Sequence, residues 1–433
     1  MREVVVYLSE WDERTPDPGT PLAGMAFEDA AVRELARQLS ASRKLKVLEL
    51  AQGVAIHSTS FVGRVRLGRL HITVQPKITS LPLLTLVRYA YGLRHLDLFP
   101  DTGYDVVVSS FQDLLIHQLA AETAELVARG LHREYVRTAQ TLASPRGRLD
   151  FQTYARQGGM GQAALPCVHH PRLAATLINR VLLAGLHLGV RLTEDLTLRT
   201  RLRRLAQILE IDITPARLDA DTLAQAEQAL DRRTVAYRPA LTLVTLLLRS
   251  AGLLLDEGET GLRLPGFLFD MNLFFQALLA RFLREYLTGY TIYEEYRLKG
   301  MLTYVPGHNP RRRRAPEPRP DYVIQRDTRT IALLDAKYRD LWEHSLPREM
   351  LYQLVIYALS QAARAEAVIL YPTLHPGAQD ARIAIRDPLY SDDRAYVVLR
   401  PVNLLHLERL ISASDRHQQR QACEAFANYL VLG

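Results

Sequence analysis

Hydrophobic and polar residues alternate with a period of two in several segments of the first hundred residues. The alternation is clearest in residues 62–78, VGRVRLGRLHITVQPKI, which predict a hairpin with one solvated face. Residues Val4–Leu8 and Leu45–Leu50 are rich in branched residues and predict two further strands. We therefore expect a β-rich N-terminal domain over residues 1–105.

The hydrophobic period changes to that of a helix after residue 110. Apolar residues recur at helical spacing in four segments: 111–128, 173–188, 196–211 and 221–230. Long amphipathic helices of this kind are suited to binding one another or another protein. The pattern predicts a helical middle region over residues 106–261.

The last part of the chain mixes both periods. A helix is predicted at 271–287, with Asp270 as its N-cap. It is followed by a strand at 290–298, a hairpin with arms at 321–325 and 330–337, a helix at 347–363 and a strand at 367–371. This α-β-β-β-α-β order predicts an α/β domain over residues 262–433, so the whole chain is expected to be a multidomain α+β protein.

Composition narrows the class of protein. The chain of 433 residues carries a formal charge of +7, mostly from arginine, which is compatible with nucleic-acid binding. Two cysteines exclude a disulfide framework, and with no apolar run long enough for a membrane span we expect a cytoplasmic protein. A zinc site at Cys167, His169 and His170 is disfavoured because no second cluster of ligands exists.

Candidate chemistry lies on the predicted hairpin. Asp335 and Lys337 are two apart on one arm, so their side chains project to the same side, and the antiparallel return can bring Asp321 beside them. Asp335 ends an apolar run, where an unpaired carboxylate is costly. Two carboxylates and one ammonium suit phosphodiester hydrolysis, because carboxylates bind Mg²⁺ and a lysine can orient or deprotonate the attacking water. The alternative is a solvated Asp–Lys edge without chemistry.

These residues resemble a known motif. Pro320-Asp321, followed by Asp335-Ala336-Lys337, is similar to the PD-(D/E)xK nuclease motif, and the order of elements resembles the core of that fold. Gln353 and Tyr357, four apart on one helical face, match the Q-x-x-x-Y element of its RecB-like branches. The resemblance implies that these five residues, Asp321, Asp335, Lys337, Gln353 and Tyr357, form the catalytic site.

Longer phrases narrow the resemblance. FDMNLFFQALL, RPDYVI, LLDAKY and YQLVIYA resemble the nuclease domain of the McrC family, and FVGRVRLGRLHITVQPKI resembles its β-rich front. The resemblance implies an Mg²⁺-dependent (or Mn²⁺-dependent) DNA endonuclease subunit of a restriction system used in anti-phage defence. It also implies two partners: a hexameric McrB-like AAA+ GTPase, which the 106–261 region would dock, and double-stranded DNA carrying modified bases.

One position departs from the family pattern. The first nuclease helix of the family usually carries a glutamate at the metal site, whereas Gln276 stands there in this chain and is expected to bind the metal only as a neutral ligand. Glu294 or Glu295 is a possible substitute. One alternative is therefore a non-catalytic assembly and GTPase-activating subunit with a decayed nuclease site. A stand-alone RecB-like nuclease is a separate alternative.

A run of four arginines shortly before Asp321 is the candidate DNA-binding segment. Arginine suits phosphate groups, and the position of the run next to the predicted site favours contact with the DNA backbone. A solvated loop without function is the alternative. The residues expected to contact DNA are Arg311, Arg312, Arg313 and Arg314.

Overall fold

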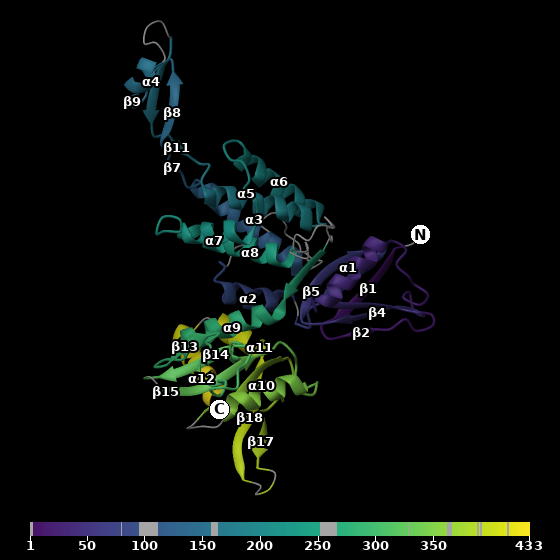
Figure 1. Ribbon diagram of the computed structural model, residues 1–433. Coiled ribbons are helices and arrows are strands. Elements are labelled where there is room, and N and C mark those ends of the chain that lie inside the picture. The colour runs from purple at the N-terminus through teal and green to yellow at the C-terminus, as the bar shows by residue number, and fades with distance from the viewer. Residues whose placement is uncertain are drawn as a thin grey trace. The chain divides into compact units, whose positions relative to one another are not determined.

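The chain forms two compact units in a computed structural model (Figure 1). One unit comprises Met1–Leu93 and Leu253–Gly433, and the other comprises Arg94–Gly252. The structure describes residues 3–78, 80–94, 111–156, 163–251, 266–327, 329–361, 366–387, 389, 392–413 and 415–433. Among the helices in these ranges, none has the length and apolar character needed to cross a bilayer.

The N-terminal part of the first unit contains two sheets. The first has the strand order β1-β6-β5-β12, formed by β1 (Val4–Ser9), β6 (Leu70–Gln75), β5 (Phe61–Leu67) and β12 (Gly266–Asp270). The second contains β2 (Glu13–Arg14), β4 (Gly53–Ser58) and β3 (Leu45–Leu50), and α1 (Ala30–Ala41) packs on β3. The hairpin expected within residues 62–78 is confirmed as β5 and β6, which pair antiparallel.

Parallel pairing of β1 with β6 places the ends of both strands at one edge. Ser9 lies opposite Gln75 at the end of this ladder. The residues that follow, Glu10–Trp11 and Lys77–Ile78, therefore leave the sheet side by side. Alternate residues of the two strands, such as Leu8 and Val74, are buried in the core of this part.

The C-terminal part of the first unit is a six-stranded mixed sheet in the order β13-β14-β15-β16-β18-β17. Its strands are β13 (Thr291–Glu294), β14 (Tyr322–Arg326), β15 (Arg329–Ala336), β16 (Glu366–Thr373), β17 (Ala381–Arg386) and β18 (Asp393–Asn403). Only β15–β16 and β16–β18 pair in parallel. The predicted α-β-β-β-α-β order is confirmed as α9-β13-β14-β15-α10-β16.

Helices pack against this sheet. Helix α9 (Met271–Tyr286) begins where predicted, with the Asp270 side chain accepting hydrogen bonds from two backbone N–H groups of its first turn. Helix α10 (Arg348–Leu359) packs on β16 and β18, and α12 (Arg416–Leu432) packs on α9 and β15. Helices α2 (Ser80–Tyr91) and α11 (Leu404–Ser412) complete the unit.

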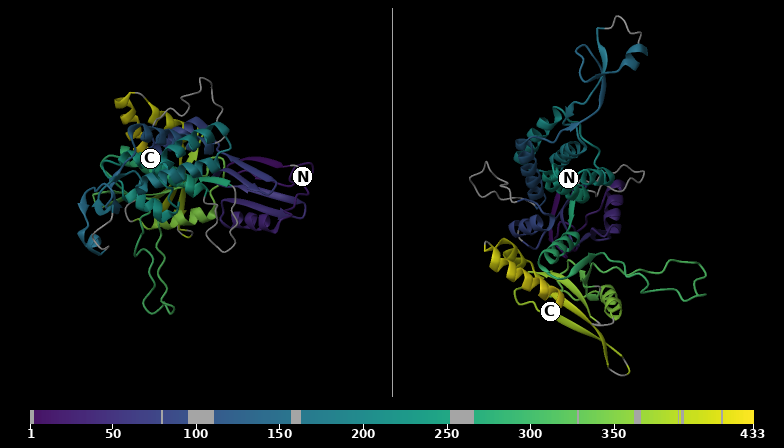
Figure 2. Two further views of the ribbon diagram at one scale, coloured as in Figure 1. Left: turned by 90° about the horizontal axis from the view of Figure 1, so that it is seen from above. Right: turned by 90° about the vertical axis from the view of Figure 1, so that its left-hand side faces the viewer.

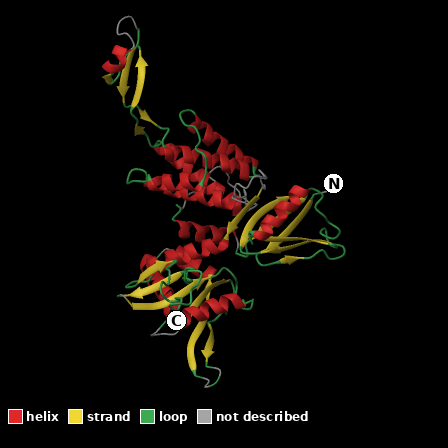
Figure 3. Cartoon of the chain, in the orientation of Figure 1, coloured by secondary structure: helices red, strands yellow, loops and turns green. Residues whose placement is uncertain are grey.

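The second unit is helical at its core but carries strands that the hydrophobic period does not reveal. The helices are α3 (Phe111–Arg129), α5 (Leu177–Leu192), α6 (Leu196–Glu210), α7 (Ala220–Gln228) and α8 (Arg238–Ala251). Residues 134–173 add two small sheets and the short α4 (Phe151–Arg156), which stand out from the helices (Figure 3). One sheet pairs β7 (Glu134–Tyr135) with β11 (Arg172–Leu173), and the other has the order β8 (Thr138–Leu142), β10 (Leu165–His169) and β9 (Arg148–Leu149). Residues 173–176, expected to open a helix, instead precede α5.

The predicted domain boundaries near residues 105 and 261 lie outside the described residues. On either side of the second boundary, however, the described residues are linked: β12 joins the N-terminal sheet through pairing with β5 and leads directly into α9. The β-rich front and the C-terminal sheet thus belong to one compact unit.

Candidate active site

Strand geometry brings the three predicted residues of the hairpin together. Tyr322 of β14 lies opposite Leu334 of β15, so the next pair along the ladder is Asp321 and Asp335. Val323 and Leu333 point into the core beneath α10, and residues two apart share a face. The side chains of Asp321, Asp335 and Lys337 consequently gather on the α10 side of the sheet.

The contacts among these three side chains are direct. The ammonium nitrogen of Lys337 lies 2.8 Å from Oδ2 of Asp335 and 3.3 Å from Oδ2 of Asp321. The same Oδ2 of Asp321 accepts a hydrogen bond of 2.8 Å from the backbone N–H of Ala336. The backbone N–H of Lys337 donates to the carbonyl of Leu370 on β16, which fixes the end of β15 against its parallel neighbour.

Burial and charge shape the protonation of this cluster. Burial, followed by the neighbouring charge of Asp321, raises the pKa of Asp335 to about 6. For Lys337, burial lowers the pKa, but the attraction of Asp335 and Asp321 outweighs it and the net shift is upward. Lys337 is therefore an ammonium that neutralises one of two adjacent acids, and the cluster keeps an unmatched acidic group.

One atom of the cluster fits a divalent cation. Oδ1 of Asp335 is buried and has no hydrogen-bond partner among the described residues, although an unpaired buried carboxylate oxygen is costly. Hard cations prefer carboxylate oxygens, so Asp335 and Asp321 suit Mg²⁺ or Mn²⁺. Within the described ranges, His, Cys, Asp and Glu side chains form no group of three or more that could hold a metal ion. Further ligands would have to be neutral groups, water or the substrate.

The two predicted residues of α10 lie together beside this cluster. The Gln353 amide donates a 2.7 Å hydrogen bond to the hydroxyl of Tyr357. Tyr357 is buried, which raises its pKa, and the charges of Asp335, Asp321 and Lys337 also act on its hydroxyl. The Gln353–Tyr357 pair thus forms a neutral, hydrogen-bonded wall next to the charged residues.

Gln276 is close to the cluster through its backbone. Its carbonyl accepts a 2.6 Å hydrogen bond from the hydroxyl of Tyr322, the residue after Asp321. One turn earlier on the same helical face, the Asn272 side chain accepts from the backbone N–H of Tyr338, the residue after Lys337. Within the described part of the chain, no hydrogen bond joins the Gln276 side chain to the acids, so its role as a ligand stays a prediction.

The two glutamates that could substitute for it are engaged elsewhere. Glu294 forms an ion pair with Arg284 of α9, and Glu295 lies 3.3 Å from Arg319. Because Glu294 pairs with Tyr322, which points to the α9 side, its side chain leaves the sheet on the face opposite Asp335.

The predicted DNA-contacting arginines lie on an extended loop. Figure 2 shows the segment between β13 and β14, drawn in green, projecting from the sheet. The loop returns to the sheet at Pro320, directly before Asp321. All four side chains of the predicted arginine run are exposed: Arg311, Arg312, Arg313 and Arg314.

Contacts of these arginines are local to the loop. The backbone N–H of Arg312 donates to the backbone carbonyl of Asn309, and the backbone N–H of Arg313 donates to the Asn309 side-chain oxygen. The Arg314 guanidinium is 3.3 Å from the carboxylate of Glu317. Within the described part of the chain, no hydrogen bond or ion pair joins Arg311, Arg312, Arg313 or Arg314 to the acids of the cluster. The four arginines thus lie on a loop that ends next to Asp321, but among the described residues they do not pair with the acids of the cluster. Their contact with DNA stays a prediction.

Three residues next to the cluster were not identified from the sequence. Glu10, Trp11 and Lys77 follow strands of the N-terminal sheet and contact the segment immediately after Lys337. The sequence signal for this contact was Glu10, an acid shortly after a predicted strand. Nothing in the sequence indicated that it contacts Tyr338, which is more than 300 residues away.

Comparison with known proteins identifies a matching family model and a solved structure with a similar fold. A family model described as "McrBC 5-methylcytosine restriction system component" matches residues 56–372, well over half of the chain. A chain of a Thermococcus gammatolerans structure, described as a half-complex from a tetradecameric assembly of McrB AAA+ hexamers with bound McrC, is similar in fold. The two share 20% sequence identity with a TM-score of 0.64, covering 98% of this chain and 100% of that chain.

A chain of the cryo-EM structure of the Thermococcus gammatolerans McrBC complex also matches. It has 20% identity and a TM-score of 0.47, with 66% of this chain and 88% of that chain covered. Comparison with curated proteins gives no match.

Proposed function

Because this chain belongs to the family of McrBC 5-methylcytosine restriction system components, we propose that it is the nuclease subunit of such a system. In this proposal it hydrolyses DNA phosphodiesters with Mg²⁺ or Mn²⁺ at Asp321, Asp335 and Lys337. The observation that carries the proposal is the buried, unpartnered Oδ1 of Asp335 beside a second carboxylate and an ammonium. A purely structural ion pair gives no reason to leave that oxygen without a partner.

Each residue has a distinct task in the proposed reaction. Asp321 and Asp335 hold the cation, which when bound supplies positive charge to the scissile phosphate and the attacking water. Lys337, within 3.3 Å of both acids, orients that water and offsets the negative charge that develops on the phosphate. The Gln353–Tyr357 pair is close enough for the charges of this cluster to act on the Tyr357 hydroxyl, and it limits the access of solvent to them. Gln276 adds a neutral oxygen ligand.

DNA would be held by the loop between β13 and β14. Its four exposed arginines in a row can contact successive phosphates, and arginine forms bidentate contacts with phosphate oxygens. Such contacts position the duplex without reading its sequence. Choice of the modified base is therefore assigned to a partner.

That partner, in this proposal, is an AAA+ GTPase hexamer. The similar Thermococcus gammatolerans structure is described as McrB AAA+ hexamers with bound McrC. The second compact unit of this chain contributes none of the active-site residues, which leaves it available for docking. Large exposed apolar side chains in its strand-rich segment, including Tyr135 and Phe151, support an interface with another protein.

A second function rests on one specific observation. Because the described residues contain no group of three acidic, His or Cys ligands, a subunit that assembles the ring and stimulates its GTPase without cutting DNA is the competing hypothesis. Cleavage of methylated and unmethylated DNA decides between them, measured with and without the cognate GTPase and with Mg²⁺, Mn²⁺ or EDTA. Cleavage that needs a divalent cation and is lost in Asp335→Asn supports the nuclease. Stimulated GTP hydrolysis without any cleavage supports the alternative.

A further inference from the structure

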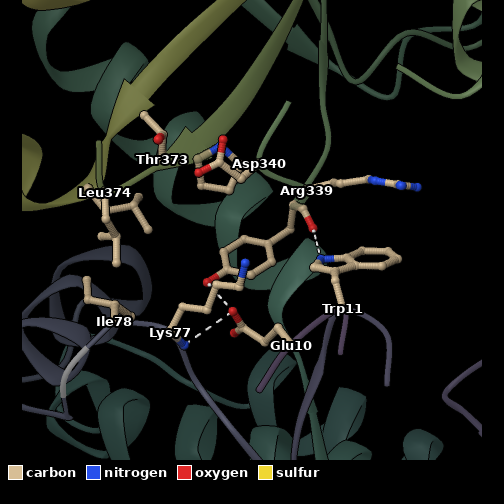
Figure 4. A pocket seen from close by; sticks show the side chains of 11 residues that line it. Glu10, Trp11, Lys77, Ile78, Arg339, Asp340, Thr373 and Leu374 are labelled. Carbon is tan, nitrogen blue, oxygen red and sulfur yellow. Dashed lines mark hydrogen bonds between the residues drawn. The ribbon is translucent and has the colours of Figure 1, made fainter. Parts of the chain in front are cut away.

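A small cavity lies between the N-terminal sheet and the segment that follows Lys337. It has a volume of about 30 Å³, enough for one water molecule rather than a ligand. Glu10 and Lys77, which follow strands of the N-terminal sheet, lie on one side of it, and Asp340 and Thr373 of the C-terminal part lie on the other (Figure 4). The cavity therefore marks a junction within the first unit, and Tyr338, the residue after Lys337, lines it.

Three contacts from side chains that follow strands of the N-terminal sheet hold this segment. The indole N–H of Trp11 donates a 3.0 Å hydrogen bond to the carbonyl of Tyr338, and the guanidinium of Arg339 lies 5.3 Å from the centre of the Trp11 ring. Five residues after Tyr338, the carboxylate of Glu343 is 3.3 Å from the ammonium of Lys77. The residues that follow β1 and β6 thus contact the segment immediately after Lys337.

The backbone of Trp11 is itself unusual. Its φ angle is +59°, in the left-handed region that a bulky side chain rarely adopts. Such a conformation persists only where the surroundings fix it, and it is found preferentially at functional sites. Here it accompanies the hydrogen bond of the indole to Tyr338.

Glu10 adds a buried acid to the same junction. Its Oε2 accepts from the backbone N–H of Lys77 at 3.3 Å and from the hydroxyl of Tyr338 at 3.5 Å. Its Oε1 is buried with no hydrogen-bond partner in the described ranges. Burial raises the pKa of Glu10 to about 7, despite the opposing effects of Lys77 and Tyr338; Arg339 and Asp340 are the other ionisable groups around the cavity.

We propose that Trp11 and Glu10 are positioning residues for Lys337, so that the N-terminal sheet sets where the active-site ammonium lies. The proposal rests on the nuclease function argued above. Tyr338 is held at three points: its N–H by Asn272, its carbonyl by Trp11 and its hydroxyl by Glu10. Because Tyr338 is the next residue in the chain, movement of its backbone moves Lys337 relative to the two acids. Displacements on the order of 1 Å are enough to slow a reaction about a hundredfold.

The first test removes one hydrogen bond and keeps an aromatic side chain at position 11. Trp11→Phe is compared with Tyr7→Phe, which removes a hydroxyl from an exposed side chain of the same sheet. Trp11→Phe is expected to lower kcat for DNA cleavage about five- to tenfold, the scale of one lost buried hydrogen bond, with KM for DNA unchanged. Amide hydrogen exchange of the peptide 336–342 should become faster in this variant. Tyr7→Phe should leave both readouts at wild-type values.

The second test uses the charge of Glu10. Burial disfavours the ionised form of Glu10, so the junction should loosen as this acid loses its proton. Protection of peptide 336–342, corrected for intrinsic exchange, should therefore fall as pH increases through about 7. The ratio of wild-type to Glu10→Gln kcat should fall over the same range. Glu13→Gln, an exposed acid on β2, serves as the control and should follow the wild type.

The outcomes separate the two proposals. If peptide 336–342 responds to both variants but the wild type never cuts DNA, the nuclease function fails while the contact of Trp11 and Glu10 with this segment stands. If the wild type cuts DNA and neither variant changes kcat or exchange, the positioning role is overturned. Faster exchange with unchanged kcat overturns it as well, because the segment then moves without affecting Lys337.

Discussion

Asp335 binds the Lys337 ammonium at 2.8 Å through one carboxylate oxygen, while its other oxygen is buried without a partner in the described part of the chain. A simple ion pair would be stabilised by satisfying both oxygens. An acid held half-satisfied at the end of a buried strand is instead typical of a site that is completed by a ligand. The first two predictions follow from this pair.

Replacing either acid with its amide should abolish cleavage without unfolding the protein. Asp335→Asn and Asp321→Asn keep the side-chain shape, and the amide oxygen at position 321 can still accept from the Ala336 N–H, but each change removes a charged cation ligand. We expect cleavage to fall below detection while circular dichroism is unchanged. Asp327→Asn, in the exposed turn between β14 and β15, is the matched control and should cut normally. Wild-type rates in either active-site variant would refute the site assignment.

Replacing the lysine should separate turnover from cation binding. Lys337→Ala removes the group that acts on the water, so kcat should fall about 10²- to 10⁴-fold. Affinity for Mg²⁺ should hold or increase, because the ammonium that competes for Asp335 and Asp321 is gone. Calorimetric titration with Mg²⁺, alongside single-turnover cleavage, measures the two quantities separately. A variant that lost Mg²⁺ affinity and kept kcat at saturating Mg²⁺ would contradict this role.

The buried acid Glu10 should make stability depend on pH. Its pKa is raised from 4.5 to about 7, so its protonated form favours the fold: this contribution is complete below pH 4.5 and is lost as pH rises through about 7. Glutamine stays neutral at every pH, so Glu10→Gln should not lose stability as the pH rises. At pH 8 the free energy of unfolding of this variant should exceed that of the wild type by about 1–3 kcal/mol. Urea unfolding at pH 5 and pH 8 tests this, with Glu13→Gln as the control. An equal or lower stability of Glu10→Gln at pH 8 would mean that the carboxylate is well solvated or paired.

A fourth prediction concerns the neutral residue on α9. Gln276→Glu places a third carboxylate one side chain from the start of β14 and should tighten Mg²⁺ binding and raise cleavage at low Mg²⁺ concentration. Gln276→Ala should have the opposite effect on affinity. If both variants bind Mg²⁺ as the wild type does, the Gln276 side chain does not reach the cation, and its contribution is limited to the carbonyl that accepts from Tyr322.

Local patterns were sufficient to predict the centre of the site. The period of a strand fixes the common face of Asp335 and Lys337, and antiparallel return brings Asp321 opposite Asp335. The order of elements around them was also predictable, because each is long enough to show its hydrophobic period.

Contacts between distant segments could not be predicted in this way. The hydrogen bond from Trp11 to Tyr338 joins residues 327 positions apart, and β12 pairs with β5 across about 200 residues of chain. Strands of two residues, such as β7 and β9, are too short to show any period. Both the strand-rich segment of the second unit and the link between the N-terminal sheet and α9 therefore emerged only from the structure.

The last prediction is that docking to the GTPase ring belongs to the second compact unit. Its helices and strands, residues 94–252, form their own core and contain none of the proposed active-site residues. A fragment of residues 94–252 should therefore bind the ring in a pull-down and should not cut DNA.

A fragment of residues 262–433 is a poor complement to this experiment, because it separates β12 from β5 and exposes a sheet edge. The better complement is the full chain with Tyr135→Ser and Phe151→Ser, two exposed aromatic residues of the second unit. This variant should lose ring binding about tenfold or more while keeping Mg²⁺ affinity. Ring binding by this variant at wild-type strength, together with no binding by fragment 94–252, would assign docking to the first unit instead.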